Sequence, residues 1–149
     1  MKKLLICFCL AIVFMLYFGF NYYFYSQKDG ITTSGVYVKE MAKTSAQETD
    51  FGFIKQATFC GAENAKKYFN KGNVVGEFLE ANPQTFNLDL FAQKMGLVVL
   101  SKTNLESSQN IYCYCALSPY KIKDKDFNMQ ISISKTKIIV ATPIIFGSF

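Results

Sequence analysis

The sequence predicts an α+β protein in which an N-terminal transmembrane helix precedes a small domain with an antiparallel sheet packed by helices. Three observations predict this architecture. The chain opens with a long uncharged apolar run, its middle is rich in helix-forming segments, and its C-terminal third holds short runs typical of strands. The 149 residues leave enough chain beyond the apolar run for one hydrophobic core. We therefore expect an anchor at 1–25, a linker at 26–35 and one domain at 36–149.

The apolar run covers residues 4–25, contains no charge and directly follows Lys2 and Lys3. As a helix it would reach ~33 Å at ~1.5 Å per residue, which matches a hydrocarbon core of ~30 Å. A cleaved signal peptide needs small residues at the first and third positions before the cut, but cleavage after Ser26 would place Phe24 at the third. We therefore expect an uncleaved, single-pass anchor in the cell membrane.

The orientation of the anchor is not decided by charge alone, because lysines stand on both sides of the apolar run. The order of lysines followed at once by apolar residues is typical of signal sequences and favours a cytoplasmic N-terminus. A long C-terminal domain crosses the membrane regardless of its charge. We therefore expect the domain outside the cytoplasm, with Asn21 and the tyrosines near the end of the run in the far headgroup layer.

The first segments after the anchor change character from polar to apolar. Residues 26–35 contain two glycines and several hydroxyl side chains, so we expect a short linker. Residues 36–46 are rich in helix-compatible types and predict a short helix. Residues 50–59 place apolar side chains among few charges, which predicts a strand.

The middle of the chain, from 62 to 96, predicts three helical pieces, at 62–69, 74–82 and 85–96. Glycine and proline divide them, because glycine weakens a helix and proline lacks the amide donor. The third piece has the clearest signals: Thr85 as its N-cap, and Gly96 as a stop after a lysine.

The C-terminal third predicts a meander of antiparallel strands that the helices should cover on one face. In 129–134, apolar and polar residues alternate, which predicts one packed and one wet face. The polar segments 103–109 and 118–126 are expected to be loops. The expected strands are 97–101, 110–117, 128–134 and 136–141, with 144–149 extended.

The C-terminal residues resemble those of the YwmB-like family of low-GC Gram-positive proteins. In that family an Asn-led strand, here 128–133, is followed by a strand running into a Thr-Pro-Ile-Ile element, here within 137–149. The segment Ala-Leu-Ser-Pro-Tyr at 116–120 looks like a further family feature. The resemblance is best over 97–149. It implies a fold similar to the TATA-box-binding protein and carries no established activity.

The composition removes much of the catalytic repertoire. The chain has no histidine, and all 16 basic residues are lysine. No Ser-His-Asp triad, Cys-His dyad or imidazole zinc site can form, and there is no guanidinium to bind phosphate or guanine. We therefore expect no catalytic set, no cofactor and no metal site. Asp124, Asp126 and Asn128 imitate the opening of a calcium loop, but Met129 and Lys135 stand where glycine and glutamate are needed.

Three cysteines lie in the expected domain. Cys113 and Cys115 are two apart in a strand-like segment, so their side chains share one face, and Cys60 ends an earlier strand. Outside the cytoplasm a disulfide from Cys60 to one of this pair is chemically permitted. The alternative is three buried thiols that pack as small apolar residues.

The leading functional hypothesis is a non-enzymatic domain, tethered to the outer face of the membrane, whose sheet or edge strand engages another envelope protein or a wall polymer. One alternative is a small hydrolase or transferase that uses Glu77, Glu80 and Asp89. Another is a nucleic-acid-binding domain that faces the cytoplasm. Without Lys2 and Lys3 the chain carries 14 lysines against 11 acids, about +3, which is a weak field for nucleic acid. We therefore expect no nucleic-acid partner.

Overall fold

A computed structural model describes residues 1–40, 47–49, 52–58 and 73–146. The elements are α1 (Lys2–Phe24), a short 3-10 turn η1 (Lys28–Gly30), β1 (Ile31–Glu40), β2 (Gln47–Thr49), β3 (Gly52–Thr58), β4 (Val74–Ala81), α3 (Leu88–Met95), β5 (Val98–Asn104), β6 (Ser108–Tyr114), β7 (Met129–Ser134) and β8 (Ile138–Thr142). In these residues one eight-stranded sheet has the order β2-β3-β1-β4-β8-β7-β6-β5, with every pairing antiparallel. The α+β class with an N-terminal apolar helix is confirmed.

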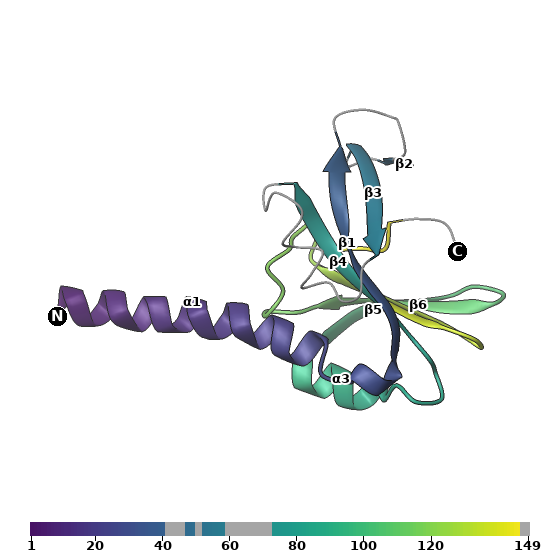
Figure 1. Cartoon of the computed structure of the whole chain (residues 1–149), viewed down its shortest axis with the longest axis horizontal. Helices are drawn as coiled ribbons and strands as arrows, with labels where there is room; N and C mark the ends of the chain where they lie inside the picture. Colours follow the sequence, from purple (N-terminus) through teal and green to yellow (C-terminus); the bar gives the residue numbers. More distant parts are fainter. Residues whose placement is uncertain (41–46, 50–51, 59–72, 147–149) are drawn as a thin grey trace.

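Helix α1 projects from the domain for most of its length, and only its C-terminal end packs on the sheet (Figure 1). Along the projecting part, apolar side chains such as Leu10 and Phe14 are exposed. The helix is long and apolar enough to cross a membrane, and a signal sequence has the same length and composition. At its C-terminal end Phe20 and Phe24 are 1% and 0% exposed. The expected boundary between anchor and domain therefore lies inside the fold, and the last turns of the helix belong to the core.

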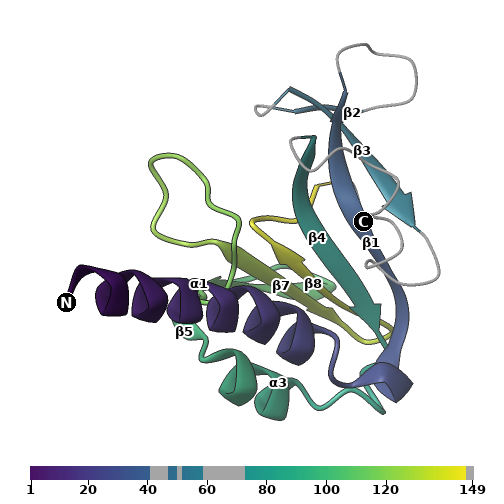
Figure 2. The same ribbon diagram turned by 60° about the vertical axis from the view of Figure 1, so that its left-hand side comes forward.

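The main core lies between one face of the sheet and two helices, α3 and the end of α1, as Figure 2 shows. Fully buried side chains from both sides meet there: Phe24 and Phe91 from the helices, Leu79, Met129 and Val140 from the strands. A second cluster occupies the other face, where the C-terminal segment packs on the sheet. Its buried members are Tyr37, Ile54, Phe78, Ala141 and Phe146.

The expected linker and short helix are wrong where the structure describes them, because residues 31–40 form one long strand. Strand β1 lies between β3 and β4, and its residues Ser34 to Val38 are all buried. The hydroxyl-rich start resembles a loop by composition, but its amides and carbonyls pair with neighbouring strands. The helix expected to continue over 41–46 lies outside the described residues, whereas β3 confirms the strand expected at 50–59.

The helix expected at 74–82 is also wrong, because this segment is strand β4. It lies between β1 and β8 and is buried on both faces, so its apolar residues do not alternate with polar ones. A short apolar run of this kind cannot be told from a buried helix by periodicity alone. Pairing with β1 and β8 makes this segment a strand, since tertiary pairing overrides local propensity. The helix expected at 62–69 lies outside the described residues.

Helix α3 confirms the third expected helix, with one change at its N-terminus. The cap is Asn87, not Thr85, and its side chain accepts a hydrogen bond from the Leu90 amide at 2.9 Å. Gly96 ends the helix with φ 63°, the left-handed conformation that favours glycine.

The C-terminal strands confirm the expected meander, but the expected wet face of β7 is wrong, because Gln130 and Ser132 are 6% and 3% exposed. Strands β5 to β8 pair in sequence, and the apolar residues of β7 face the main core. The loop expected at 103–109 is shorter than predicted, because β5 continues to Asn104 and β6 begins at Ser108. The loop expected at 118–126 contains no strand or helix, as predicted.

Candidate functional site

The junction between α1 and the sheet is built from stacked aromatic rings. Phe20 and Phe24 stack within the helix with ring centroids 4.9 Å apart. Phe24 also contacts Phe91 of α3 edge to face at 5.9 Å, and Phe91 contacts Phe86 at 5.5 Å. Aromatic pairs in these arrangements add to the free energy of burial. The last turns of the apolar helix are thus held by the core rather than by a flexible linker.

A buried carboxylate adds polar contacts to this junction. Glu77 of β4 is 0% exposed, on the helix-covered face of the sheet. The hydroxyl of Tyr25, just after α1, donates to Glu77 Oε1 at 2.6 Å. The hydroxyl of Tyr120, in the loop after β6, donates to Oε2 at 2.7 Å. Since a buried carboxylate is costly without partners, these two bonds connect the end of α1 and the loop to the central strand β4.

The residues that carry the family resemblance meet beside this carboxylate. The Asn128 side chain accepts from the Cys115 amide at 2.7 Å and donates to the Cys115 carbonyl at 2.8 Å. The Thr142 hydroxyl donates to the Asn128 carbonyl at 2.8 Å and is hydrogen-bonded to the Ser118 hydroxyl. Ser118 is two residues from Tyr120, so the loop that this network fixes also places the phenol on Glu77.

The three candidate carboxylates do not come together. Glu77 lies on the helix-covered face of β4, and Glu80 lies on the opposite face, 3.6 Å from the Lys137 ammonium. Asp89 lies in the first turn of α3, where a negative charge interacts favourably with the helix dipole. Each of the three therefore has a separate structural setting.

Cys113 and Cys115 point to one face, as predicted, and both are fully buried in the main core as free thiols. Burial, followed by the nearby Cys115, raises the pKa of the Cys113 thiol to about 11. Burial also raises the pKa of Cys115. Cys60 lies outside the described residues, so the disulfide from Cys60 stays a prediction.

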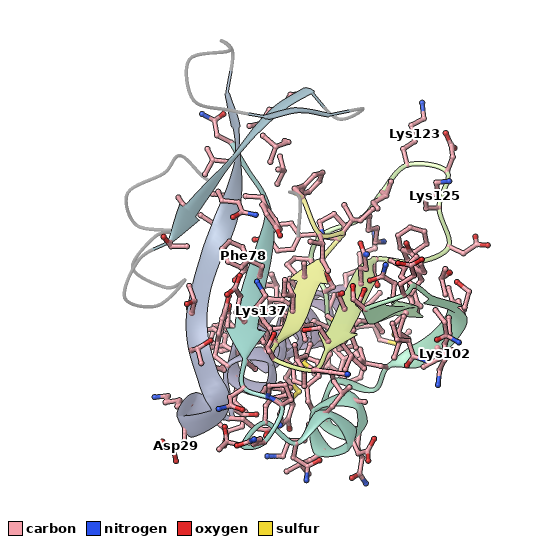
Figure 3. The ribbon with its side chains drawn as sticks, turned by 90° about the vertical axis from the view of Figure 1, so that its right-hand side faces the viewer. Asp29, Phe78, Lys102, Lys123, Lys125 and Lys137 are labelled. Carbon is pink, nitrogen blue, oxygen red and sulfur yellow. The ribbon has the colours of Figure 1, made fainter. Side chains whose placement is uncertain are left out.

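The loop between β6 and β7 carries the sequence that imitates a calcium site. Lys121, Lys123, Asp124, Lys125 and Asp126 are all exposed there, and Figure 3 shows Lys123 and Lys125 projecting from the loop. Among the described residues no three histidine, cysteine or acidic side chains are grouped as metal ligands. The loop is therefore a charged surface.

The sequence hypothesis names an edge strand without saying which one, and the structure places β5 at one outer edge of the sheet. Strand β5 pairs only with β6 among the described strands, and all seven of its residues are exposed. Its first three residues, Val98, Val99 and Leu100, are apolar and between 47% and 54% exposed. Three consecutive apolar residues place apolar side chains on both faces, a pattern that indicates a buried strand by composition.

Comparison of the chain with protein-family models, curated proteins and solved structures returns no match.

Proposed function

We propose that the chain is a membrane-anchored, non-enzymatic interaction domain of the cell envelope. The observation that carries the proposal is the division of α1 into two parts. The projecting part exposes its apolar side chains, while Phe20 and Phe24 are fully buried in the domain. Exposed apolar surface on a helix of this length needs lipid around it. Cleavage after the helix would remove both phenylalanines from the core, and we infer that the anchor is retained.

The domain lies outside the cytoplasm in this proposal, and the chain is related to the YwmB-like family. The lysines at the start of α1 support the orientation. The hydrogen bonds among Ser118, Asn128 and Thr142 support the family relationship, since they give the short motifs a shared structural role.

Binding is favoured over catalysis because the candidate carboxylates are separated. A general acid and base must reach the same substrate, but Glu77 and Glu80 lie on opposite faces of β4. The binding surface in this proposal is the outer edge of β5, whose backbone can accept an added strand. Ser101 and Thr103 lie in the C-terminal half of β5. The partner is another envelope protein or a wall polymer.

A photo-crosslinking residue placed at Thr103 in intact cells tests this function. We expect one discrete adduct with an envelope protein or wall polymer, and none from the same probe at the exposed Asp29. Protease added to intact cells should digest the domain. A protected domain, or equal labelling from both positions, would contradict the proposal, and an adduct that contains nucleic acid would support the cytoplasmic alternative.

A further inference from the structure

We propose that the domain rests on the bilayer surface through a membrane-proximal patch, consisting of Val98, Val99, Leu100 and Tyr114, with lysines beside it that reach anionic headgroups. The inference rests on the proposed function, because it requires α1 to span the membrane. The surface that this patch contacts is the headgroup layer of the same membrane.

The membrane-proximal patch is the main apolar surface outside α1. Its four side chains are 54%, 50%, 47% and 42% exposed. Val98 pairs directly with Tyr114, so these two side chains share one face, and Val99, paired with Cys113, lies on the other face at the same end of the sheet. Among the described residues beyond α1, the other exposed large hydrophobics are Leu90 and Leu105. Exposed apolar side chains gathered at one end of a sheet indicate a contact surface, and tyrosine is typical of the membrane interface.

This end of the sheet lies on the side of the domain from which α1 emerges. In Figures 1 and 2, α3 ends on that side, β5 begins there, and the loop between β6 and β7 extends to the same side. Leu117, at the start of that loop, faces Gly19 of α1, because a methyl group at Gly19 would lie 3.7 Å from the Leu117 side chain. The projecting, lipid-facing part of the helix and the patch are therefore adjacent.

Because the projecting part of α1 is short, this end of the sheet lies close to the bilayer. The uncharged part before the domain, residues 4–18, spans ~22 Å at ~1.5 Å per residue. A hydrocarbon core is ~30 Å thick, so the span is short for a bilayer. A short span is accommodated by local thinning and by bringing flanking groups into the interface. The first protein surface that meets the headgroups is then the membrane-proximal patch.

The charges around the patch suit an anionic surface. Lys121, Lys123 and Lys125 are exposed on the loop that reaches the same side, and two aspartates reduce their sum to +1. Lys94 adds one positive charge at the end of α3. Lysine side chains lay their aliphatic part on apolar surface and place the ammonium among phosphates. The apolar residues thus supply the contact, and the lysines select anionic lipid.

Tryptophan fluorescence tests the inference, because the chain contains no tryptophan. Val99→Trp and Tyr114→Trp each report from the membrane-proximal patch, and Leu105→Trp, just beyond the far end of β5, is the matched control. Each full-length variant is reconstituted into vesicles of phosphatidylcholine and phosphatidylglycerol with brominated acyl chains. We expect a blue-shifted emission and loss of intensity for both patch variants, and neither effect for the control.

The outcomes separate the two proposals. If alkaline carbonate extracts the chain from the vesicles, the anchor itself is wrong and both proposals fail. If the chain resists extraction but the patch variants are no more quenched than the control, the surface contact alone is overturned. In the background K121Q/K123Q/K125Q we expect weaker quenching in anionic vesicles, and unchanged quenching would overturn the role of the lysines.

Discussion

At the scale of single residues, the junction depends on one buried carboxylate. Glu77 accepts hydrogen bonds from two phenolic hydroxyls, that of Tyr25, 52 positions before it, and that of Tyr120, 43 positions after it. Tyr25 was expected in the headgroup layer, but its hydroxyl instead bonds to Glu77 of the domain. Tyr25, at the end of the apolar run, thus serves the fold.

Replacing Glu77 by Gln should destabilise the protein. A carboxamide accepts from one phenol and presents a donor to the other, which leaves a buried group poorly paired at a cost of ~1–3 kcal/mol. Thermal unfolding of the full chain in detergent micelles, followed by circular dichroism, measures the change. Glu80→Gln is the matched control, and its partly exposed ion pair contributes under ~1 kcal/mol. Equal effects of the two substitutions would contradict the account.

The buried Cys113 predicts a dependence on pH. Its pKa is raised from 9.0 to about 11, so the fold favours the neutral thiol. The resulting stabilisation is present below pH 9 and is lost as the pH rises toward 11. We expect slow alkylation of the Cys113 peptide at pH 8, faster alkylation as the pH rises, and rapid alkylation in denaturant.

Mass spectrometry of the digested protein measures this alkylation residue by residue. Rapid labelling of the folded protein at pH 8 would contradict the burial. A peptide joined to Cys60 before reduction would support the predicted disulfide instead.

At the scale of elements, the sequence predicts segments whose pattern matches their environment. Strand β7 is predictable because apolar and polar residues alternate along its sequence, even though Gln130 and Ser132 are buried. Helix α3 is predictable because glycine ends it. Strands β1 and β4 are not predictable in this way, because central strands buried on both faces lose the alternation of apolar and polar residues. Their identity depends on pairing with distant neighbours, which local sequence does not contain.

The candidate site could likewise be predicted only in part from the local sequence. The sequence identifies Glu77 as a carboxylate in the middle of the chain, but on a helix with a solvated face. Its partners Tyr25 and Tyr120 come from segments expected to lie in the membrane and in a loop. Only the tertiary fold brings the three together. The exposed start of β5 was missed because its composition is that of a buried strand.

The end of α1 acts as a core element, and this role predicts the effect of Phe24→Ala. The side chain is 0% exposed and contacts Phe20 and Phe91. Its truncation should lower the free energy of unfolding by ~3–5 kcal/mol. Phe8→Ala, at a 66% exposed position of the same helix, is the control and should leave unfolding in micelles nearly unchanged. A small effect of Phe24→Ala would show that the domain folds independently of the helix.

At the scale of the whole molecule, the proposed function assigns anchoring and folding to the same helix. The projecting part of α1 exposes apolar side chains, and its buried end completes the core beneath β4 and beside α3. With α1 in the membrane as proposed, a junction of this kind holds the domain at a fixed place against the bilayer, unlike a domain on a flexible tether. The proposed contact of the membrane-proximal patch follows from that placement.

Intact-mass spectrometry of the protein extracted from its native membrane tests the central claim most directly. If α1 is both anchor and core element, the mass must include residues 1–25, and the N-terminal peptide with Lys2 and Lys3 must be recovered from the membrane fraction. A mature chain that begins after Tyr25, stably folded and released from the membrane, would contradict the account.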